Sequence, residues 1–356
     1  MTGRTITIED REIGISCPPY VIAEMSANHN GKIETALGII DAAKMAGADA
    51  VKIQTYTPET ITLNSDREDF LIRGGLWDGR TLHDLYREAH MSWDWHAPLF
   101  DHARKTGITL FSSPFDNTAV DLLEDLNAPA YKIASLEIVD LPLIRYVGRT
   151  GKPMIISTGI ADAAEIEEAI EAAREGGCDE LALLHCVTGY PAPASDYNLR
   201  TIPDMAERFG VAVGLSDHTL GSATAIASIA LGAAIVEKHF TLDRSGGGPD
   251  DSFSLEPTDL TNLCRDIRTA WGALGRVSYE IKVSEQQNLA YRPSIYVSRD
   301  VQAGDLLSED NVRTVRPGFG LACKHLNDVI GQKFLSDVEL GTPLSWDLIT
   351  AQEEPR

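Results

Sequence analysis

Residues 211–240 read VAVGLSDHTLGSATAIASIALGAAIVEKHF and contain two short apolar runs, Val211–Leu215 and Ala234–His239. The segment between the two runs is long enough for the crossover that joins consecutive parallel strands. Polar residues stand at the end of each run, Ser216-Asp217-His218 after the first and Glu237-Lys238-His239 in the second. The stretch therefore predicts two parallel strands whose carboxyl ends carry polar side chains.

Six further apolar runs precede this stretch. They are Tyr20–Met25, Ala50–Tyr56, Ile108–Ser112, Ala130–Ala134, Pro153–Ser157 and Leu181–Val187. Amphipathic segments with a helical period, such as Ile33–Ala46 and Ala161–Gly176, lie between most of the runs. Eight strands that alternate with helices over about 240 residues predict an α/β fold, a (β/α)8 TIM barrel. A doubly wound parallel sheet is the competing arrangement, because its strands are also buried on both faces.

The segments on either side of the predicted barrel do not continue the alternation of strands and helices. Thr5–Ile8 and Glu12–Ser16 predict a hairpin that closes the bottom of the barrel. A polar stretch follows the barrel, and short strands at Ser294–Val297 and Val312–Val315 then alternate with turn signals. A β-rich module of about 60 residues is marginal alone, so we expect it to dock on the barrel or on a second subunit. The predicted domains are a barrel over residues 1–281, a linker over 282–291 and a small β-rich domain over 292–356.

The composition limits the partners and the compartment. The chain has 31 Lys and Arg against 53 Asp and Glu, a formal net charge of −22, which argues against a nucleic-acid or anionic-membrane binder. The negative net charge does not exclude a small anionic substrate, because a few lysines in a closed pocket make the local electrostatic potential positive. Five scattered cysteines without metal spacing predict reduced thiols. With no apolar signal region at the N-terminus, and with Ala223–Val236 too short to span a bilayer, we expect a cytoplasmic protein.

Polar residues occur at the end of every predicted barrel strand. Since barrel enzymes work at the carboxyl ends of their strands, and since polar groups are costly to bury without a task, these residues predict one central site. In strand order they are Glu24; Lys52 and Gln54; Ser112 and Ser113; Lys132, Ser135 and Glu137; Ser157; His185, Thr188 and Tyr190; Ser216, Asp217 and His218; Glu237, Lys238 and His239.

Two lysines inside apolar strands are the sharpest anomaly. Lys52 lies in Ala-Val-Lys-Ile-Gln and Lys132 in Tyr-Lys-Ile-Ala-Ser. The plainest interpretation is a buried stem whose ammonium group reaches water. The functional interpretation is the binding of a phosphate or carboxylate with help from serine hydroxyls. A Schiff-base lysine is the third alternative.

Two histidines and one glycine-rich loop complete the candidate set. His218 and His239 follow neighbouring strands, so their imidazoles could converge on one divalent ion, or each could be an ordinary histidine. Imidazole and oxygen ligands would accept Mn²⁺, Mg²⁺, Co²⁺ or Zn²⁺ and leave positions open for water and a substrate oxygen. The loop Ser245–Ser254 has neither P-loop nor dinucleotide spacing. Its Asp250 and Asp251 either face the site or belong to a flexible acidic loop.

Taken together, these motifs resemble the sialic acid synthase (nonulosonic acid synthase) family over nearly the whole chain. Val315-Arg316-Pro317-Gly318 is similar to the antifreeze-like SAF domain that follows the barrel in this family. Gly74–Asp78, Leu85-Tyr86, Trp95-His96, Gln54–Pro58 and Asp66–Phe70 resemble the pseudaminic acid synthase branch. The matching barrel motifs are Ile22-Ala23-Glu24, Asn28-His29-Asn30-Gly31, Lys52-Ile53-Gln54-Thr55, Ser113-Pro114-Phe115, Tyr131–Ser135, Ser157-Thr158-Gly159, His185-Cys186, Gly214–Thr219 and Glu237–Phe240.

The resemblance implies a reaction. The family condenses phosphoenolpyruvate with an N-acylated amino sugar to a nine-carbon 2-keto acid and releases phosphate by C–O cleavage. In the pseudaminic branch the sugar is 2,4-diacetamido-2,4,6-trideoxy-altrose. A legionaminic or N-acetylneuraminic acid synthase is the alternative within the family. A Schiff-base aldolase on Lys132 or Lys238, and a non-catalytic carbohydrate- or ice-binding protein, are remote alternatives from other classes.

The resemblance also implies a role for each motif residue. His218 and His239 would bind a divalent metal, Mn²⁺ before Mg²⁺ or Co²⁺, and Glu24 and Glu137 would steer or deprotonate the water that adds at C2. A domain-swapped homodimer would bring Arg316 of the SAF domain into the partner's barrel. Thr188 departs from the Asn that many members carry. Phosphoenolpyruvate would contact Lys52, Ser113, Lys132, Ser135, Ser157, Thr188, Tyr190 and Ser216, and the sugar would contact Gln54, Asn28, Asp250 and Arg316.

Overall fold

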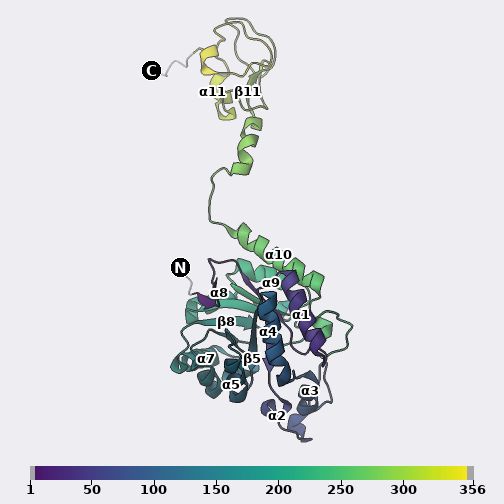
Figure 1. The fold of residues 1–356 in the computed structure, drawn as a ribbon. Helices are drawn as coiled ribbons and strands as arrows, with labels where there is room; N and C mark the ends of the chain where they lie inside the picture. The colour runs from purple at the N-terminus through teal and green to yellow at the C-terminus, as the bar shows by residue number, and fades with distance from the viewer. Residues whose placement is uncertain (1–4, 351–356) are drawn as a thin grey trace. The chain divides into compact units, whose positions relative to one another are not determined.

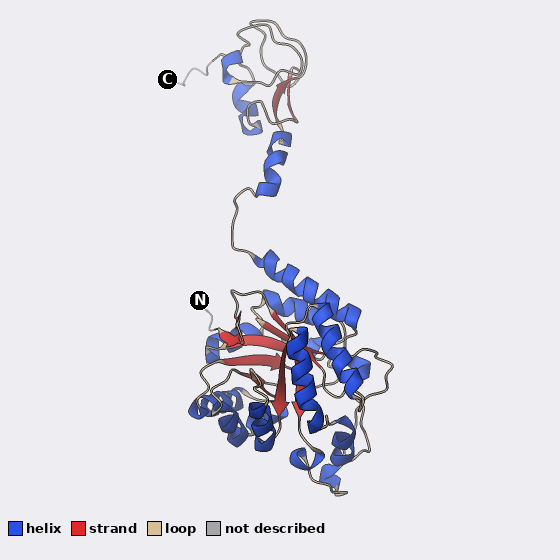
Figure 2. Ribbon diagram, viewed as in Figure 1, coloured by secondary structure: helices blue, strands red, loops and turns tan. Residues whose placement is uncertain are grey.

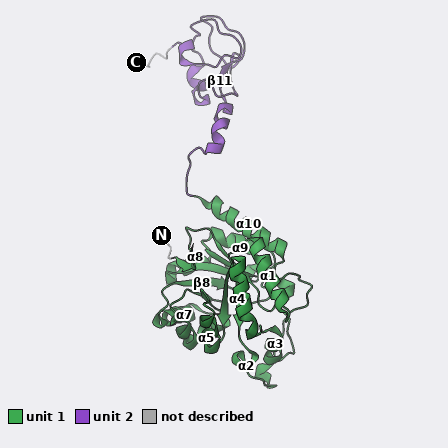
Figure 3. Ribbon diagram, in the orientation of Figure 1, with its two compact units in different colours: residues 1–275 green, residues 276–356 purple. Residues whose placement is uncertain are grey.

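The computed structural model describes residues 5–350 of the chain. Residues 1–4 and 351–356, the ends of the two predicted domains, lie outside the described part. The chain forms two compact units, residues 1–275 and residues 276–356 (Figure 3). None of the helices within residues 5–350 combines the length and the apolarity needed to cross a bilayer.

Eight parallel strands of the first unit form a closed barrel, in the order β10-β3-β4-β5-β6-β7-β8-β9 (Figures 1 and 2). Closure of the sheet confirms the TIM barrel and excludes the doubly wound alternative. The strands are β3 Tyr20–Glu24, β4 Ala50–Thr55, β5 Thr109–Pro114, β6 Tyr131–Ile133, β7 Met154–Ser157, β8 Leu181–Cys186, β9 Ala212–Asp217 and β10 Ile235–His239.

Helices connect the strands. The connection from β4 to β5 is the longest and carries α2 and α3, which lie at one end of the barrel (Figure 1). Short 3-10 helices, η1 to η5, interrupt the loops at Glu68–Phe70, Trp93–Trp95, Leu136–Val139, Ala194–Asp196 and Asp251–Phe253. The helices are α1 Ile33–Ala46, α2 Pro58–Ile61, α3 Leu82–Ala89, α4 His96–Thr106, α5 Asn117–Asp125, α6 Leu141–Gly148, α7 Ala163–Gly176, α8 Thr201–Phe209, α9 Ala223–Ala230 and α10 Pro257–Leu274.

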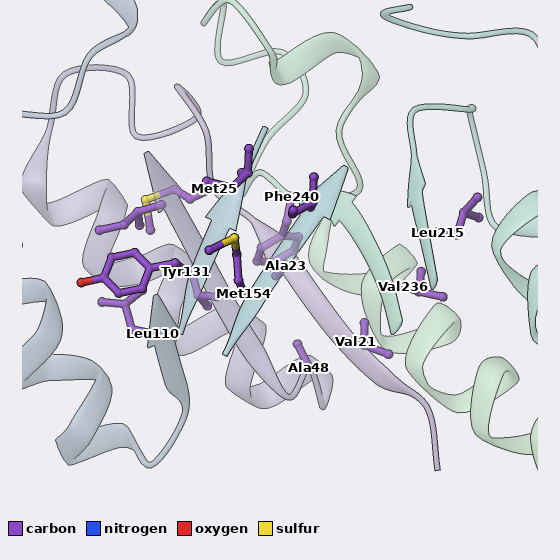
Figure 4. Close-up of a cluster of buried hydrophobic side chains, with 14 of the residues drawn as sticks. Val21, Ala23, Met25, Ala48, Leu110, Tyr131, Met154, Leu215, Val236 and Phe240 are labelled. Carbon is purple, nitrogen blue, oxygen red and sulfur yellow. The ribbon is translucent and has the colours of Figure 1, made fainter. Parts of the chain in front are cut away.

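Side chains along each barrel strand alternate between two apolar layers. Val21 and Ala23 of β3 point outward into the layer between strands and helices, where Figure 4 shows them with Tyr131, Met154 and Val236. Tyr20 and Ile22 point inward and join a separate cluster inside the barrel. This two-residue period determines which polar side chains at the strand ends face the interior.

The N-terminal hairpin closes the barrel interior at the amino ends of the strands, as predicted. β1 (Ile6–Ile8) pairs antiparallel with β2 (Arg11–Ile13). Ile6, Ile8 and Ile13 are fully buried against the inward apolar residues of the strands. The apolar bottom leaves the carboxyl end of the barrel as the end where polar groups gather.

The second unit begins earlier than the sequence pattern indicates. The division falls after Gly275, because α10 ends at Leu274, and most of the expected linker forms the 3-10 helix η6, Val283–Tyr291. The strands β11 (Ser294–Val297) and β12 (Val312–Val315) have the predicted bounds, and they pair antiparallel with each other. Three short helices follow, η7 Cys323–His325, α11 Leu326–Val329 and η8 Trp346–Leu348. The unit has its own apolar core, which includes Ile295, Phe334 and Leu344.

Candidate active site

The predicted polar residues meet in one cavity at the carboxyl ends of the barrel strands. The cavity encloses about 1240 Å³ when its open mouth is included. Lys52, Lys132, His218 and His239 all line it, as the sequence analysis requires. The other predicted residues that line it are Glu24, Gln54, Ser135, Glu137, Ser157, Thr188, Tyr190, Ser216 and Asp250.

A buried ion cluster forms the centre of the cavity floor. Lys52 Nζ lies 2.9 Å from Glu24 Oε2 and 3.5 Å from Glu237 Oε1, and the three side chains are at most 7% exposed. Burial acts to lower the pKa of Lys52, but the two carboxylates outweigh it and raise that pKa. Burial raises the pKa of Glu24, so this carboxyl is the member of the cluster that most readily holds a proton. Lys52 therefore stays charged.

Glu237 is a site residue that sequence reasoning did not assign. It lies two residues before His239 on β10, so both side chains point inward, whereas Lys238 between them points outward. The two-residue period was the signal that could have identified it. Its ion pair with Lys52 places a second carboxylate beside the lysine that was predicted to bind an anion.

Lys132 and a set of hydroxyl groups also line the cavity. Lys132 is 1% exposed, and burial lowers its pKa to about 8. Ser157 Oγ and Thr188 Oγ1 are buried without a hydrogen-bond partner in the described structure. Since buried hydroxyls are normally satisfied, these atoms fit a ligand with acceptor oxygens, such as a phosphate.

Gly159 lets the backbone approach these hydroxyl groups closely. Its N–H donates to Ser135 Oγ at 3.1 Å. A Cβ atom at this position would lie 2.2 Å from Thr188 Oγ1 and 2.8 Å from Ser135 Oγ. Only glycine therefore fits here without displacement of the hydroxyl groups.

The two predicted metal ligands converge. Their rings are 5.3 Å apart, and the Tyr190 ring lies 4.3 Å from His218. His218 Nδ1 lies 2.8 Å from the carbonyl oxygen of Val187 and donates to it, which leaves Nε2 free to coordinate an ion. His239 Nδ1 is buried, has no hydrogen-bond partner within residues 5–350, and lies 4.0 Å from an Asp250 carboxylate oxygen. These imidazoles fit a divalent ion.

The protein supplies only part of such a coordination sphere. Among residues 5–350, no group of three His, Cys, Asp or Glu side chains is arranged to hold an ion. Two imidazoles leave coordination positions of the ion open, and water and a substrate oxygen can occupy these positions.

Glu137 is the second predicted catalytic carboxyl, and it lies at the edge of the cavity. Burial raises its pKa to about 7, and its Oε2 atom has no hydrogen-bond partner in the described structure. A carboxyl with a pKa near neutrality can both accept and donate a proton at physiological pH. The geometry thus suits the proton transfer that was expected of it.

Gln54 and Asp250 belong to one hydrogen-bonded chain. Gln54 Nε2 donates to Glu24 Oε1 at 2.9 Å and to Ser26 Oγ at 3.0 Å, and Ser26 Oγ donates to Asp250. Both amide hydrogens of Gln54 are used, so its carbonyl oxygen is left to accept from a ligand.

An apolar wall bounds the cavity on the side of the β4–β5 connection. Tyr56 anchors it through edge-to-face contacts with Tyr86 and Phe115, at 5.7 and 5.1 Å between ring centroids. We use the name apolar wall for Tyr56, Ile61, Ile72, Trp77, Leu82, Leu85, Tyr86, Ala89 and Phe115.

Three predicted contact residues lie elsewhere. Asn28 is fully buried and does not line the cavity, and its amide donates to the carbonyl of Phe240 and to Ser254, so its sugar contact stays a prediction. Ser113 lies behind the floor, with its Oγ 3.3 Å from Lys52 Nζ, and so reaches a ligand only through Lys52. Arg316 belongs to the second unit.

Comparisons with known proteins agree with this geometry. The sequence profile of the NeuB family matches residues 39–279, and that of the SAF domain matches residues 292–350. The chain is 43% identical to a pseudaminic acid synthase of Campylobacter jejuni, over 91% of the chain and 95% of that protein. It is 44% identical to a pseudaminic acid synthase of Helicobacter pylori, over 93% of the chain and 97% of that protein.

More distant members match as well. Identity to an N,N'-diacetyllegionaminic acid synthase of Campylobacter jejuni is 36%, over 88% of the chain and 94% of that protein. A crystal structure of an N-acetylneuraminic acid synthetase from Leptospira borgpetersenii superposes with a TM-score of 0.72 at 31% identity, over 81% of the chain and 95% of that structure. The chain therefore belongs to the NeuB family, and it is a phosphoenolpyruvate-dependent nonulosonic acid synthase with a C-terminal SAF domain.

Proposed function

We propose that this enzyme condenses phosphoenolpyruvate with 2,4-diacetamido-2,4,6-trideoxy-altrose to form pseudaminic acid and phosphate. The observation that carries the proposal is the division of one cavity into a charged floor and an apolar wall. We use the name charged floor for Glu24, Lys52, Lys132, Ser157, Ser216, His218, Glu237 and His239.

The apolar wall supports a sugar with few hydroxyl groups. The proposed sugar carries a C6 methyl group and two acetamido methyl groups, and each methyl buried against apolar side chains is worth about 0.8 kcal/mol. A sugar with hydroxyl groups in those places would lose hydrogen bonds to water against Ile61, Ile72 and Leu82. The wall thus favours a deoxygenated, diacetylated sugar over N-acetylmannosamine-like sugars.

The choice between two diacetylated sugars has separate support. Identity to the pseudaminic acid synthases is 43–44%, against 36% to the relative named for N,N'-diacetyllegionaminic acid. The pseudaminic branch is therefore the proposal, and a legionaminic acid synthase is the second candidate.

The floor supplies the charges for phosphoenolpyruvate. We assign the phosphate to Lys132 and the hydroxyls of Ser135, Ser157 and Thr188, and the carboxylate to the region of Lys52. Ser216 and Tyr190 complete this side of the cavity, and Ser113 acts by holding Lys52. Two ammonium groups in a closed site offset the repulsion that a chain of charge −22 would exert on this anion.

His218 and His239 are the residues that would hold a divalent ion, Mn²⁺ before Mg²⁺ or Co²⁺. Such an ion, when bound, polarises the aldehyde oxygen of the open-chain sugar. The carbonyl oxygen of Gln54 and the carboxylate of Asp250 would orient the sugar beside it.

The remaining steps depend on the carboxyl groups. The C2–C3 π bond of phosphoenolpyruvate supplies the electron pair with which C3 attacks the aldehyde carbon. A carbon–carbon bond forms, the C=O π bond of the aldehyde breaks, its oxygen takes up a proton to become a hydroxyl group, and positive charge develops at C2. Glu137 takes a proton from the water that adds at C2, and Glu24 steers the water or holds a proton. The tetrahedral intermediate then loses phosphate as the C2–O bond breaks.

We further propose that the enzyme is a homodimer in which Arg316 of one copy enters the barrel of the other. Arg316 is exposed and is followed by Pro317 and Gly318 in the turn after β12. A guanidinium suits a carboxylate or sugar oxygen at the cavity mouth. Complementation of an Arg316→Ala chain by a chain with an inactive barrel would test this arrangement, because only a trans contribution restores activity in mixed dimers.

A phosphate-release assay tests the proposed function. Phosphoenolpyruvate is combined with a panel of amino sugars that includes the altro and manno diacetamido-trideoxy sugars and N-acetylmannosamine, with and without Mn²⁺. We expect turnover to be highest with the altro sugar. When the oxygen that bridges carbon and phosphorus in phosphoenolpyruvate is labelled with ¹⁸O, we expect the label to appear in the released phosphate. A preference for the manno sugar would support the legionaminic candidate, and label retained in the sugar acid would contradict C–O cleavage.

A further inference from the structure

Lys238 is a buried cation that the proposed reaction does not use. Its side chain is 2% exposed, and that of its partner Asp217 is fully buried. Lys238 Nζ lies 2.8 Å from Asp217 Oδ2, and it also donates to the carbonyl oxygen of Thr219 at 2.6 Å. All donors of this ammonium group point away from the cavity, because Lys238 faces outward on β10.

The pair is located directly behind the two candidate metal ligands. Asp217 and Lys238 are cross-strand partners, and theirs is the last paired position between β9 and β10. His218 and His239 are the next residues of the two strands. The Asp217–Lys238 ion pair thus lies at the last paired position between β9 and β10, and His239 is still paired with Glu24 of β3 on its other side.

Asp217 also fixes the turn that carries His218. Its second carboxylate oxygen, Oδ1, accepts from the backbone N–H of Thr219 at 2.9 Å. Lys238 binds the carbonyl groups of both Asp217 and Thr219. The backbone on both sides of His218 is therefore held by one charged pair, and the His218 N–H itself donates to the Tyr197 hydroxyl at 2.6 Å.

Stability does not account for this pair. Removal of two charges from water costs as much as their attraction returns, so apolar residues of similar volume are often as good or better in such a position. The surrounding layer between strands and helices is otherwise built from residues such as Leu215 and Val236. A charged pair in this apolar layer is therefore better explained by the backbone positions that it fixes around His218.

We propose that Lys238 and Asp217 are positioning residues that set the spacing of His218 and His239 for a divalent ion. The inference rests on the metal site of the proposed function. Residues that hold metal ligands in place commonly contribute 10- to 100-fold to metal affinity, roughly the effect expected here.

The test measures binding of Mn²⁺ alone, without substrates, by electron paramagnetic resonance of the full chain. The variant Lys238→Met with Asp217→Asn removes both charges and keeps an acceptor for the Thr219 N–H. We expect its Kd for Mn²⁺ to rise roughly 10- to 100-fold, with a changed spectrum of bound Mn²⁺ and with a Tm no lower than that of the wild type.

Arg11 and Asp49 provide a matched control at the opposite end of the barrel. Arg11 Nη1 lies 2.9 Å from Asp49 Oδ1, and the other Asp49 oxygen accepts from the backbone N–H of Val21 at 2.8 Å. The Arg11 side chain is 38% exposed, so this pair is less buried than Lys238–Asp217. The variant Arg11→Met with Asp49→Asn likewise removes both charges, and its Mn²⁺ affinity should stay within twofold of the wild type.

The results distinguish failure of the positioning role from failure of the metal site. A folded Lys238→Met, Asp217→Asn variant with wild-type Mn²⁺ affinity overturns the positioning role and leaves the metal site intact. A wild-type protein that binds no Mn²⁺ overturns the metal site as well. If this variant does not fold, Lys238→Leu with Asp217→Leu fills the space with apolar groups instead. An Mn²⁺ affinity of this second variant within twofold of the wild type would likewise overturn the positioning role.

Discussion

The charged floor and the apolar wall of the cavity are built in different ways. Floor residues project from the ends of β3, β4, β6, β7, β9 and β10, or directly follow them, so closure of the barrel brings them together. Most of the wall comes from the connection between β4 and β5, where α2 and α3 lie. On the proposed function, the barrel thus carries the charges for phosphoenolpyruvate and the ion, and one long connection carries the contacts proposed to choose the sugar.

If this division holds, changes in the floor should abolish turnover with every sugar, whereas changes in the wall should alter the choice of sugar. The largest effect is expected from His239→Ala, which removes one of two imidazoles for the ion. Turnover should fall to the level of the wild type in chelated buffer, with an unchanged circular dichroism spectrum. Full activity of this variant in chelated buffer would contradict the metal assignment.

Lys132→Met should reduce kcat/KM for phosphoenolpyruvate by roughly 10²- to 10³-fold, because it removes a buried positive charge beside the phosphate. Methionine keeps the volume of the stem and needs no ion partner, so we expect the Tm to stay the same or rise. Steady-state kinetics and thermal unfolding measure the two effects. Lys105→Met on the exposed face of α4 is the control, and equal losses in both variants would refute the assignment.

The pH profile should report the two groups whose pKa values burial moves toward neutrality. Burial raises the pKa of Glu137 to about 7, so the proton-accepting form is lost as the pH falls below that value. Burial lowers the pKa of Lys132 to about 8, so the anion-binding ammonium is lost above it. We expect kcat/KM to have its maximum between the two values.

Glu137→Gln should remove the acid limb of that profile and lower kcat roughly 10²-fold. An acid limb that persists unchanged in Glu137→Gln would assign it to another group, such as Glu24. The alkaline limb, which belongs to Lys132, serves as the internal reference.

The smallest effect belongs to the wall. Trp77→Ala should raise the KM for the sugar about tenfold and leave kcat and the KM for phosphoenolpyruvate nearly unchanged, because Trp77 belongs to the apolar wall and carries none of the charges of the floor. Leu76 is its neighbour, is 55% exposed and does not line the cavity, so Leu76→Ala should behave as the wild type. A fall in kcat with Trp77→Ala would break the distinction between wall and floor.

Much of the site could be predicted from strand ends alone. Lys52, Lys132, His218 and His239 stood out because charged or metal-binding groups at the ends of apolar runs need a shared purpose. Two residues show the limits of that reasoning. Asn28 belongs to a matching motif, yet its amide donates to the carbonyl of Phe240 and its side chain does not line the cavity. Glu237 was counted among the polar strand ends without a role of its own, although it pairs with Lys52.

The sequence by itself determined the eight-fold alternation of strands and helices, the polar strand ends and the separate β-rich module, because hydrophobic periods of two and 3.6 residues are local properties. The alternation of side chains along a strand is local as well, but only the tertiary structure decided which of the two faces of each strand lines the cavity. Lys238 and Asp217 lie behind the site while Glu237 and Ser216 lie in it, since successive side chains of a strand point to opposite faces of the barrel. Closure of the barrel and the path of the β4–β5 connection likewise depend on contacts between residues far apart in the chain, which no local pattern records.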